Sequence, residues 1–203
     1  MESVIYDVSL WSDYDIYLFK QGNHFRLYEK MGSHVLDVGG KKGTYFSVWA
    51  PNACAVSVMG DFNGWAKDSH YLKVRGDGSG VWEGFIPGLP EGTRYKYHIF
   101  SMYNDYEADK GDPYAFLWET PPKTASVVYD LSYIWNDEAW MKERALRNSL
   151  KSPISIYEVH LGSWRRIPEE GNRFLTYKEM AGCLPKYVKE MGFTHVEFLP
   201  VME

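Results

Sequence analysis

The chain has 203 residues, enough for one large domain or two small ones. Its formal net charge is −5 and it has no basic stripe, which argues against nucleic acid and anionic membranes as partners. The N-terminus lacks a signal-peptide pattern and no run of about 18 apolar residues occurs, so we expect no membrane span. Aromatic residues make up 17% of the chain, and a neutral partner such as a polysaccharide needs no steering by charge.

A short helix is expected near the N-terminus. Ser12, followed three residues later by Asp15, forms a weak capping box that predicts where the helix starts. Trp11 and Ile16 occupy the two positions of a hydrophobic staple, and Gly22 predicts the end of the helix.

Neither the histidines nor the cysteines predict a metal or a cofactor. His24 and His34 have no carboxylate or cysteine at ligand spacing, so we interpret them as hydrogen-bonded surface residues. Cys54 and Cys183 lie in what we expect to be different domains, which favours reduced thiols over a disulfide. We therefore expect a cytoplasmic chain with no cofactor and no metal site.

Residues 43–65 carry the most informative pattern. Two runs rich in β-branched and aromatic residues, 45–49 and 55–59, flank a Pro-Asn turn and predict an antiparallel hairpin. The second run ends in a Gly-flanked loop with Trp65 at its tip. An indole there is a flat apolar platform on which a sugar ring can stack, but it can equally fold back into the core.

Further short strands follow between glycine- and proline-rich turns, at residues 81–86 and 94–99. One face of the second strand is apolar and predicted to be core: Tyr95, Tyr97 and Ile99. The other face is predicted to be exposed to solvent: Arg94, Lys96 and His98. Lys96 can then donate to a ligand hydroxyl or simply keep the face soluble. The spacing of these strands predicts a β-sandwich.

The pattern changes after the sandwich. Prolines at 113, 121 and 122 predict a linker, with a last short strand expected over 127–129. Asn136 is expected to cap a helix that runs to about residue 149.

From residue 153 onward the pattern is α/β. A buried strand is expected over 154–160 and a second over 194–199. Between them, Thr176 and Glu179 form a capping box that opens a helix, which Pro185 should kink or split. A lone β-α-β unit cannot cover both faces of a parallel pair, so we expect the chain to be a truncated part of a larger α/β domain.

Several stretches resemble known families. The block FSVWAPNA…VSVMGDFNGW, followed by GVWEGFIPG and YKYHI, resembles a family 48 carbohydrate-binding module. The blocks ADKGDPYAF…PPKTASVVYD, PISIYEVHLGSW and KYVKEMGFTHVEFLPVME resemble the 1,4-α-glucan (glycogen) branching enzymes of glycoside hydrolase family 13. The likeness runs from about residue 10 to residue 203.

The resemblance implies an all-β immunoglobulin-like sandwich followed by the start of a truncated (β/α)₈ TIM barrel. It divides the chain into an N-terminal helical extension (1–34), a carbohydrate-binding sandwich (35–118), a linker with a helix (119–152) and the first β-α-β unit of the catalytic barrel (153–203). The alternatives are a stand-alone glycogen-binding module and a fragment of a debranching enzyme.

The resemblance also implies a chemistry. Branching enzymes pass a segment of an α-1,4-glucan to a 6-hydroxyl by a retaining double displacement that uses two carboxylates and forms α-1,6 branches. In the family these residues lie on later barrel strands, so we expect no catalytic residue here and no activity from these 203 residues. His160 and Glu203 lie near strand ends, but the family pattern gives neither them nor Glu158 a catalytic role, so all three are assigned to structure or to the support of other site residues.

The family pattern suggests where glucan would be bound. Trp65 and Lys96 match glucan-contacting positions of glycogen-sensing modules, and Tyr103 or Tyr106 is expected to supply a second stacking face. The partners expected are glycogen or another α-1,4-glucan and the remainder of the catalytic barrel. A module that only packs on the barrel is the other interpretation.

Overall fold

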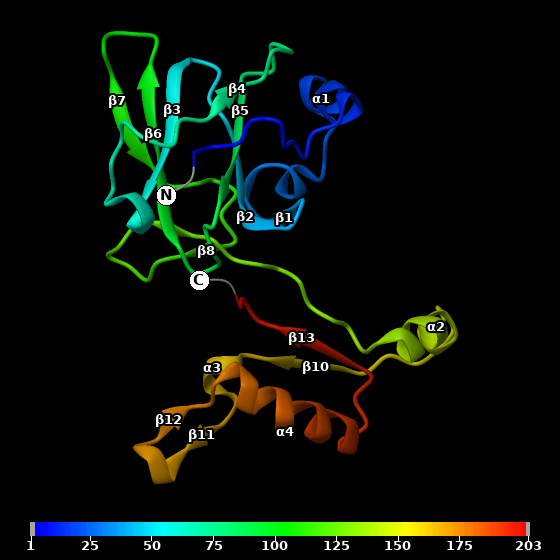
Figure 1. Cartoon of the computed structure of the whole chain (residues 1–203). Helices are drawn as coiled ribbons and strands as arrows, with labels where there is room; N and C mark the ends of the chain where they lie inside the picture. Colours follow the sequence, from blue (N-terminus) through cyan, green and yellow to red (C-terminus); the bar gives the residue numbers. More distant parts are fainter. Residues whose placement is uncertain (1–2, 202–203) are drawn as a thin grey trace. The chain divides into compact units, whose positions relative to one another are not determined.

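The structure is a computed structural model that describes residues 3–201. The chain divides into two compact units, one up to Tyr133 and one from Ile134 onward (Figure 1).

The first unit is built on two β-sheets. One sheet has the strand order β1 (Gly32–Val38), β2 (Lys41–Trp49), β5 (Val81–Pro87) and β4 (Lys73–Val74). The other has the order β3 (Ala53–Gly60), β6 (Arg94–Ser101), β9 (Ser126–Val127) and β8 (Leu117–Trp118), and β7 (Glu107–Lys110) also pairs with β6. All of these pairings are antiparallel.

Both sheets contribute alternate side chains to one apolar core. Phe46 of β2 lies edge-on to Tyr95 of β6, with ring centroids 5.0 Å apart. The core also contains Val48, Val56, Val58, Trp82, Ile86, Leu89, Tyr97 and Val128. Such packing of two sheets through their inner faces is a β-sandwich, as the strand spacing predicts.

The prediction that the runs 45–49 and 55–59 pair as an antiparallel hairpin is wrong. β2 pairs with β1 and β5, whereas β3 pairs with β6 in the other sheet. The Pro51-Asn52 turn therefore carries the chain across from one sheet to the other, and the indole N–H of Trp82 donates to the carbonyl of Ala50 at 3.0 Å beside it. Alternating side chains reveal which face of a strand is buried, but the partner strand is set by packing that the pattern does not encode.

The N-terminal helix agrees with the sequence. α1 (Asp13–Lys20) has Ser12 as its N-cap, with both bonds of the capping box to Asp15. Trp11 and Ile16 are buried together, and Gly22 follows the helix in the left-handed region at φ 70°. A single 3₁₀ turn, η1 (Leu27–Glu29), leads into β1.

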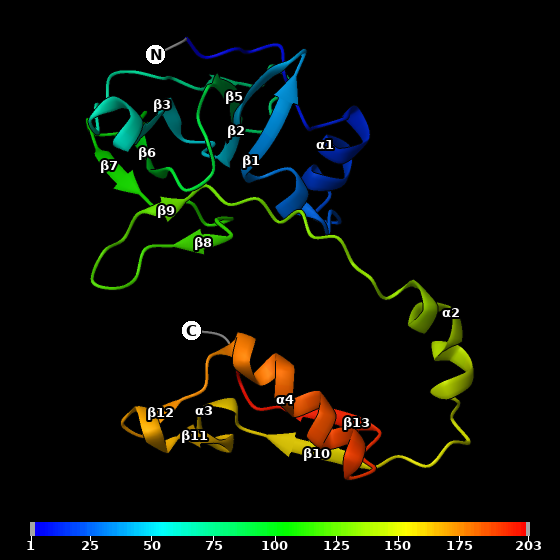
Figure 2. The ribbon, with the colours of Figure 1, turned by 60° about the horizontal axis from the view of Figure 1, so that its bottom comes forward.

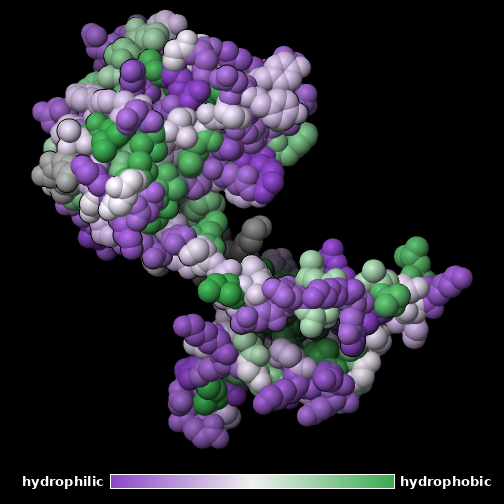
Figure 3. Space-filling model, turned by 45° about the vertical axis from the view of Figure 1, so that its right-hand side comes forward, coloured by the Kyte–Doolittle hydropathy of each residue, from purple (hydrophilic) through white to green (hydrophobic). Residues whose placement is uncertain are grey.

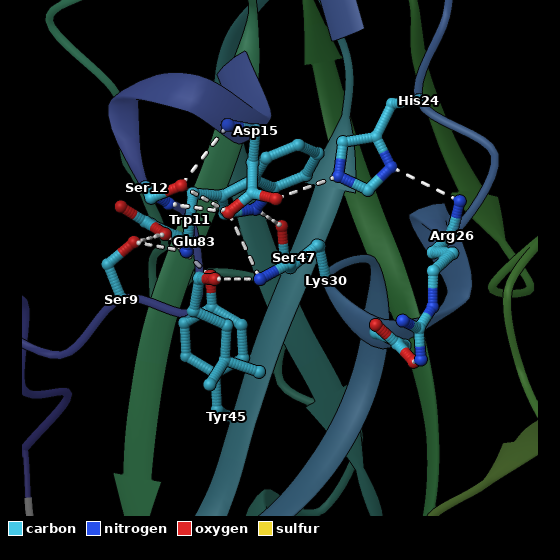
Figure 4. Close-up of polar contacts among 12 residues, drawn as sticks. Ser9, Trp11, Ser12, Asp15, His24, Arg26, Lys30, Tyr45, Ser47 and Glu83 are labelled. Carbon is cyan, nitrogen blue, oxygen red and sulfur yellow. Dashed lines mark hydrogen bonds and ion pairs between the residues drawn. The ribbon is translucent and has the colours of Figure 1, made fainter. Parts of the chain in front are cut away.

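A polar network joins this helical segment to the sandwich (Figure 4). The indole N–H of Trp11 donates to Ser47 Oγ of β2 at 3.0 Å. Asp15 accepts from Lys30 Nζ at 3.1 Å and lies 3.0 Å from a ring nitrogen of His24. The His24 side chain is therefore buried rather than at the surface, because it fills the space beside Trp11.

The second unit contains a parallel pair of strands covered by a helix (Figures 1 and 2). β10 (Ile156–Val159) and β13 (His195–Phe198) run parallel, and α4 (Tyr177–Glu190) packs on one face through Leu184 and Val188. The smaller elements are α2 (Glu138–Arg147), α3 (Leu161–Trp164), β11 (Arg166–Ile167), η3 (Pro168–Glu170) and β12 (Arg173–Phe174).

The second unit tests two predictions about helices, namely the effect of Pro185 and the cap at Asn136. α4 opens with the predicted Thr176–Glu179 capping box and continues through Pro185 as one helix, so the predicted split does not occur. α2 begins two residues after Asn136, and its N-cap is Asp137, whose side chain makes no capping bond. Asn136 is therefore not the cap.

Apolar side chains are exposed on both units (Figure 3). On the parallel pair, Ile156 is 54% exposed and Phe198 51%. No helix of the described residues is long and apolar enough to cross a bilayer.

Candidate functional site

The loop that presents Trp65 follows directly from β3. The 3₁₀ turn η2 (Asp61–Asn63) is closed by Asn63, whose side-chain oxygen accepts from the Gly60 N–H at 2.9 Å. Gly60 is required because a Cβ would lie 2.1 Å from the carbonyl of Arg94. The loop therefore starts at a position of β3 that leaves no room for a side chain beside β6.

Trp65 itself has an unusual backbone. Its φ is 62°, and its N–H donates to the Gly60 carbonyl at 2.9 Å. A bulky residue in the left-handed region is strained and persists where surrounding structure or function requires it. The side chain is 36% exposed, so the indole is a half-covered surface platform rather than part of the core.

Lys96 lies on the neighbouring strand at the same end of the sheet. In the register of β3 and β6, Met59 is opposite Lys96, and Gly60 is opposite Tyr95. Lys96 Nζ donates to Thr124 Oγ1 at 2.7 Å, which leaves further N–H donors on the ammonium group.

Arg94 braces this end of the sheet. Its guanidinium lies 2.6 Å from Asp61 in the Trp65 loop and 3.3 Å from Glu119 just after β8. The hydrogen bonds to Asp61 and then to Glu119 raise the pKa of Arg94 above its usual value. The charge of this arginine is thus engaged in holding loops together.

Tyr103 and Tyr106 lie at the opposite end of β6. They belong to the turn between β6 and β7, beyond Ser101, and are 62% and 58% exposed. Ser101 lies five positions along the strand from Lys96, which is about 17 Å. The structure therefore distributes the four predicted binding residues over two places: Trp65 with Lys96, and Tyr103 with Tyr106.

A hollow of about 260 Å³ lies beside the second place. It is lined by Cys54, Phe100, Ser101, Asp105, Tyr106 and Glu107. Cys54 is a free, exposed thiol, and its Sγ contacts the carbonyl oxygen of Phe100 at 3.4 Å.

An ionic cluster that sequence reasoning missed lies between the two places. His98, predicted to be wet, is 3% exposed, because β7 brings two carboxylates over it. These are Asp109, directly opposite His98 in the strand register, and Glu107, which also pairs with Lys67 at 2.7 Å. The alternation Glu-Ala-Asp at 107–109 was the available signal.

In the second unit, the charge cluster of Arg173, Glu170 and Glu179 lies at β12 and the start of α4, not on β10 or β13. Glu158 is exposed on β10, and His160 bonds through Nδ1 to Ser163 Oγ at 2.8 Å. Glu203 lies outside the described residues. Within residues 3–201, no group of three or more His, Cys, Asp and Glu residues is arranged to hold a metal ion.

Comparison with known proteins adds the following. Residues 30–115 match the family model of carbohydrate-binding module 48 (isoamylase N-terminal domain). The 1,4-alpha-glucan branching enzyme GlgB of Aquifex aeolicus is 62% identical over 195 residues, which cover 96% of this chain and 31% of the relative. GlgB of Gloeobacter violaceus is 54% identical over 196 residues, 96% of this chain and 27% of the relative.

Solved structures agree on the fold. Klebsiella pneumoniae pullulanase complexed with maltotriose superposes with a TM-score of 0.56 at 24% identity, over 86% of this chain and 18% of that one. GBS pullulanase SAP in complex with maltotetraose superposes with a TM-score of 0.60 at 19% identity. The match covers 86% of this chain and 24% of that one. The chain spans about a third of the length of the curated relatives it matches. Residues 30–115 therefore match the family model of carbohydrate-binding module 48, and nearly all of the chain is similar in sequence to 1,4-alpha-glucan branching enzymes.

Proposed function

We propose that this chain is part of a 1,4-alpha-glucan branching enzyme, a transferase that moves a segment of an α-1,4-glucan to a 6-hydroxyl and so forms α-1,6 branches. The observation that carries the proposal is the 62% identity over 96% of the chain to an enzyme of that name. Because the match covers only 31% of that relative, the activity belongs to a longer protein.

The second unit supports this assignment to a larger enzyme. A parallel strand pair with a helix on one face is the repeating element of a (β/α)₈ barrel. The exposure of Ile156 and Phe198 supports further strands and helices packing there in the longer protein. We place the retaining pair of catalytic carboxylates in that remainder and none in these 203 residues.

The first unit is proposed to bind α-glucan through Trp65 and Lys96. The half-exposed indole offers its face to the C–H side of a sugar ring, and Lys96 has donors left for hydroxyl groups. Pullulanases of similar fold have been solved with maltotriose and maltotetraose, which supports a linear α-glucan as the ligand class. Tyr103 and Tyr106 are proposed as a second, separate contact.

The other candidate functions have less support. A stand-alone glycogen-binding module does not account for β10, α4 and β13, whose homology to branching enzymes continues beyond the module. A debranching enzyme is suggested by the pullulanase structures alone, at 19–24% identity, a level that indicates fold rather than activity. We place the longer enzyme in the cytoplasm, in keeping with the free thiols Cys54 and Cys183.

Native affinity electrophoresis in gels with and without glycogen tests the binding role. We expect glycogen to retard the chain and Trp65→Ala to lose most of the retardation. Trp140→Ala is the control, because Trp140 is an exposed tryptophan on α2 of the other unit. An unretarded parent chain with a folded circular dichroism spectrum would contradict glucan binding by this module.

A separate assay addresses the enzyme assignment. The 203-residue chain should leave the iodine colour of amylose unchanged, whereas the longer protein that contains it should lower the colour by introducing branches. A longer protein that instead removes branches from glycogen would contradict the assignment.

A further inference from the structure

The outer face of the second sheet holds a histidine between two carboxylates. The His98 side chain is only 4% exposed, and its ring lies edge-on to Phe100, with centroids 4.4 Å apart. Its Nδ1 lies 2.6 Å from Asp109 Oδ1, and its Nε2 lies 2.9 Å from Glu107 Oε2. Both ring nitrogens therefore face an oxygen of β7.

This geometry matches one protonation state of the ring. A neutral imidazole has one N–H donor and one lone pair, whereas an ionised carboxylate only accepts hydrogen bonds. A neutral His98 would therefore direct a lone pair at a carboxylate oxygen at hydrogen-bond distance. The imidazolium satisfies both contacts, since each nitrogen then carries a proton.

The surrounding charges balance that cation. Lys67, from the loop after η2, lies 2.7 Å from Glu107 Oε2, and Asp68 stands next to it in the chain. The hydrogen bonds from Lys67 and then from His98 hold the pKa of Glu107 below its usual value, which keeps this acceptor ionised. From β3, Ser57 pairs with His98 in the register, and its hydroxyl donates to the Lys67 carbonyl at 2.5 Å. With His98 protonated, the cations His98 and Lys67 match Glu107 and Asp109, and Asp68 adds one more negative charge near Lys67.

The cluster of His98, Glu107 and Asp109 joins β6 to β7, a strand that has few pairing partners. Among the described residues, β7 pairs with β6 alone, over four residue pairs, and its other edge has no partner strand. Two of those pairs carry the charged cluster: His98 with Asp109, and Phe100 with Glu107. Side-chain contacts across the two strands therefore contribute a large part of what holds β7.

We propose that protonated His98 is a pH-sensitive clasp that holds β7, and with it the turn bearing Tyr103 and Tyr106, onto β6. Loss of the ring proton turns one attractive contact into a repulsive one, so the hairpin loosens as pH rises. The rest of the sandwich stays folded. The inference does not depend on glucan binding.

Heteronuclear NMR of the parent chain is the first test. We expect the His98 ring to carry a proton on both nitrogens at pH 6. Amide protection factors at 107–110, corrected for intrinsic exchange, should fall about five- to tenfold between pH 6 and pH 9, the range expected for losing one hydrogen bond of ordinary net strength, because both carboxylates are half-exposed to solvent. A ring with a single protonated nitrogen at pH 6, or unchanged protection, would overturn the proposal.

Variants assign the effect to this histidine. Asp109→Asn and His98→Gln should each make the protection at 107–110 nearly independent of pH. Asp105→Asn is the matched control, because Asp105 lies in the same turn at φ 49°, where asparagine is well tolerated, and should keep the full pH dependence. If His98→Gln retains the pH dependence of the parent chain, the clasp is not His98.

Discussion

The hydroxyl of Tyr45 donates a hydrogen bond to Glu83 Oε2 at 2.5 Å inside the first unit (Figure 4). Tyr45 on β2 and Glu83 on β5 come from adjacent strands, and both side chains are covered. Glu83 also accepts from Ser9 at 2.8 Å and pairs with Arg75 at 2.7 Å. One buried carboxylate thus connects the N-terminal segment, β2 and the turn after β4.

Removing one donor should show what this contact contributes. Tyr45→Phe keeps the ring but leaves Glu83 with one fewer hydrogen bond in a covered site. We expect the free energy of unfolding to fall by about 1–3 kcal/mol. Urea denaturation followed by circular dichroism measures it, and Tyr17→Phe, at an exposed position, should change stability by much less. Equal effects of the two substitutions would refute this role for Glu83.

Buried tyrosines should make the first unit sensitive to alkali. Burial is the main cause that raises the pKa of Tyr45, Tyr95 and Tyr97 above the usual value near 10, and nearby carboxylates add to it. Above about pH 10 the unfolded chain loses these phenolic protons and the folded chain retains them, so stability present below that pH is lost as pH rises. Three such groups give a slope of about 4 kcal/mol per pH unit.

The measurement is a pH titration that follows tyrosinate absorbance and circular dichroism together. We expect phenolate absorbance from these three residues to appear only as the unit unfolds. Ionisation of all tyrosines before any loss of secondary structure would contradict the prediction.

The N-terminal helix should depend on its cap. Ser12→Ala removes the acceptor for the Asp15 N–H and should destabilise the first unit by about 1 kcal/mol. Ser12→Thr restores a hydroxyl and should recover most of the loss. Thermal unfolding of the three proteins checks this, and an alanine variant as stable as the parent would show that Trp11 and Ile16 hold the helix without the cap.

The two candidate contact regions should act independently on glucan binding. Trp65 and Tyr106 lie at opposite ends of the sheet, too far apart to share partners. The factors by which Trp65→Ala and Tyr106→Ala weaken retardation in glycogen gels should therefore multiply in the double variant. A double variant no weaker than Trp65→Ala would show that Tyr106 takes no part.

Helix caps and the buried face of a strand were predictable from the sequence, because a few neighbouring residues determine them. The capping boxes at Ser12 and Thr176 and the buried face of β6 are set by short-range spacing, and the structure has them as predicted. The pairing of β2 and the burial of His98 depend on strands that arrive from elsewhere in the chain. For β7, which covers His98, the only local signal is the alternation Glu-Ala-Asp, and it does not say which strand β7 pairs with.

The candidate site divides in the same way. The Trp65 loop follows from its own glycines and Asn63, so its position at a strand end was predictable. That Tyr103 and Tyr106 lie at the other end was not, because it depends on where the turn after β6 begins.

The parallel pair in the second unit has a consequence for handling the protein. β10 and β13 pair only with each other among the described residues, so each has an outer edge of unsatisfied backbone groups. Ile156 and Phe198 add exposed apolar surface beside these edges. Two molecules of this chain can therefore extend one another's strands, and we expect concentrated samples to self-associate through this unit.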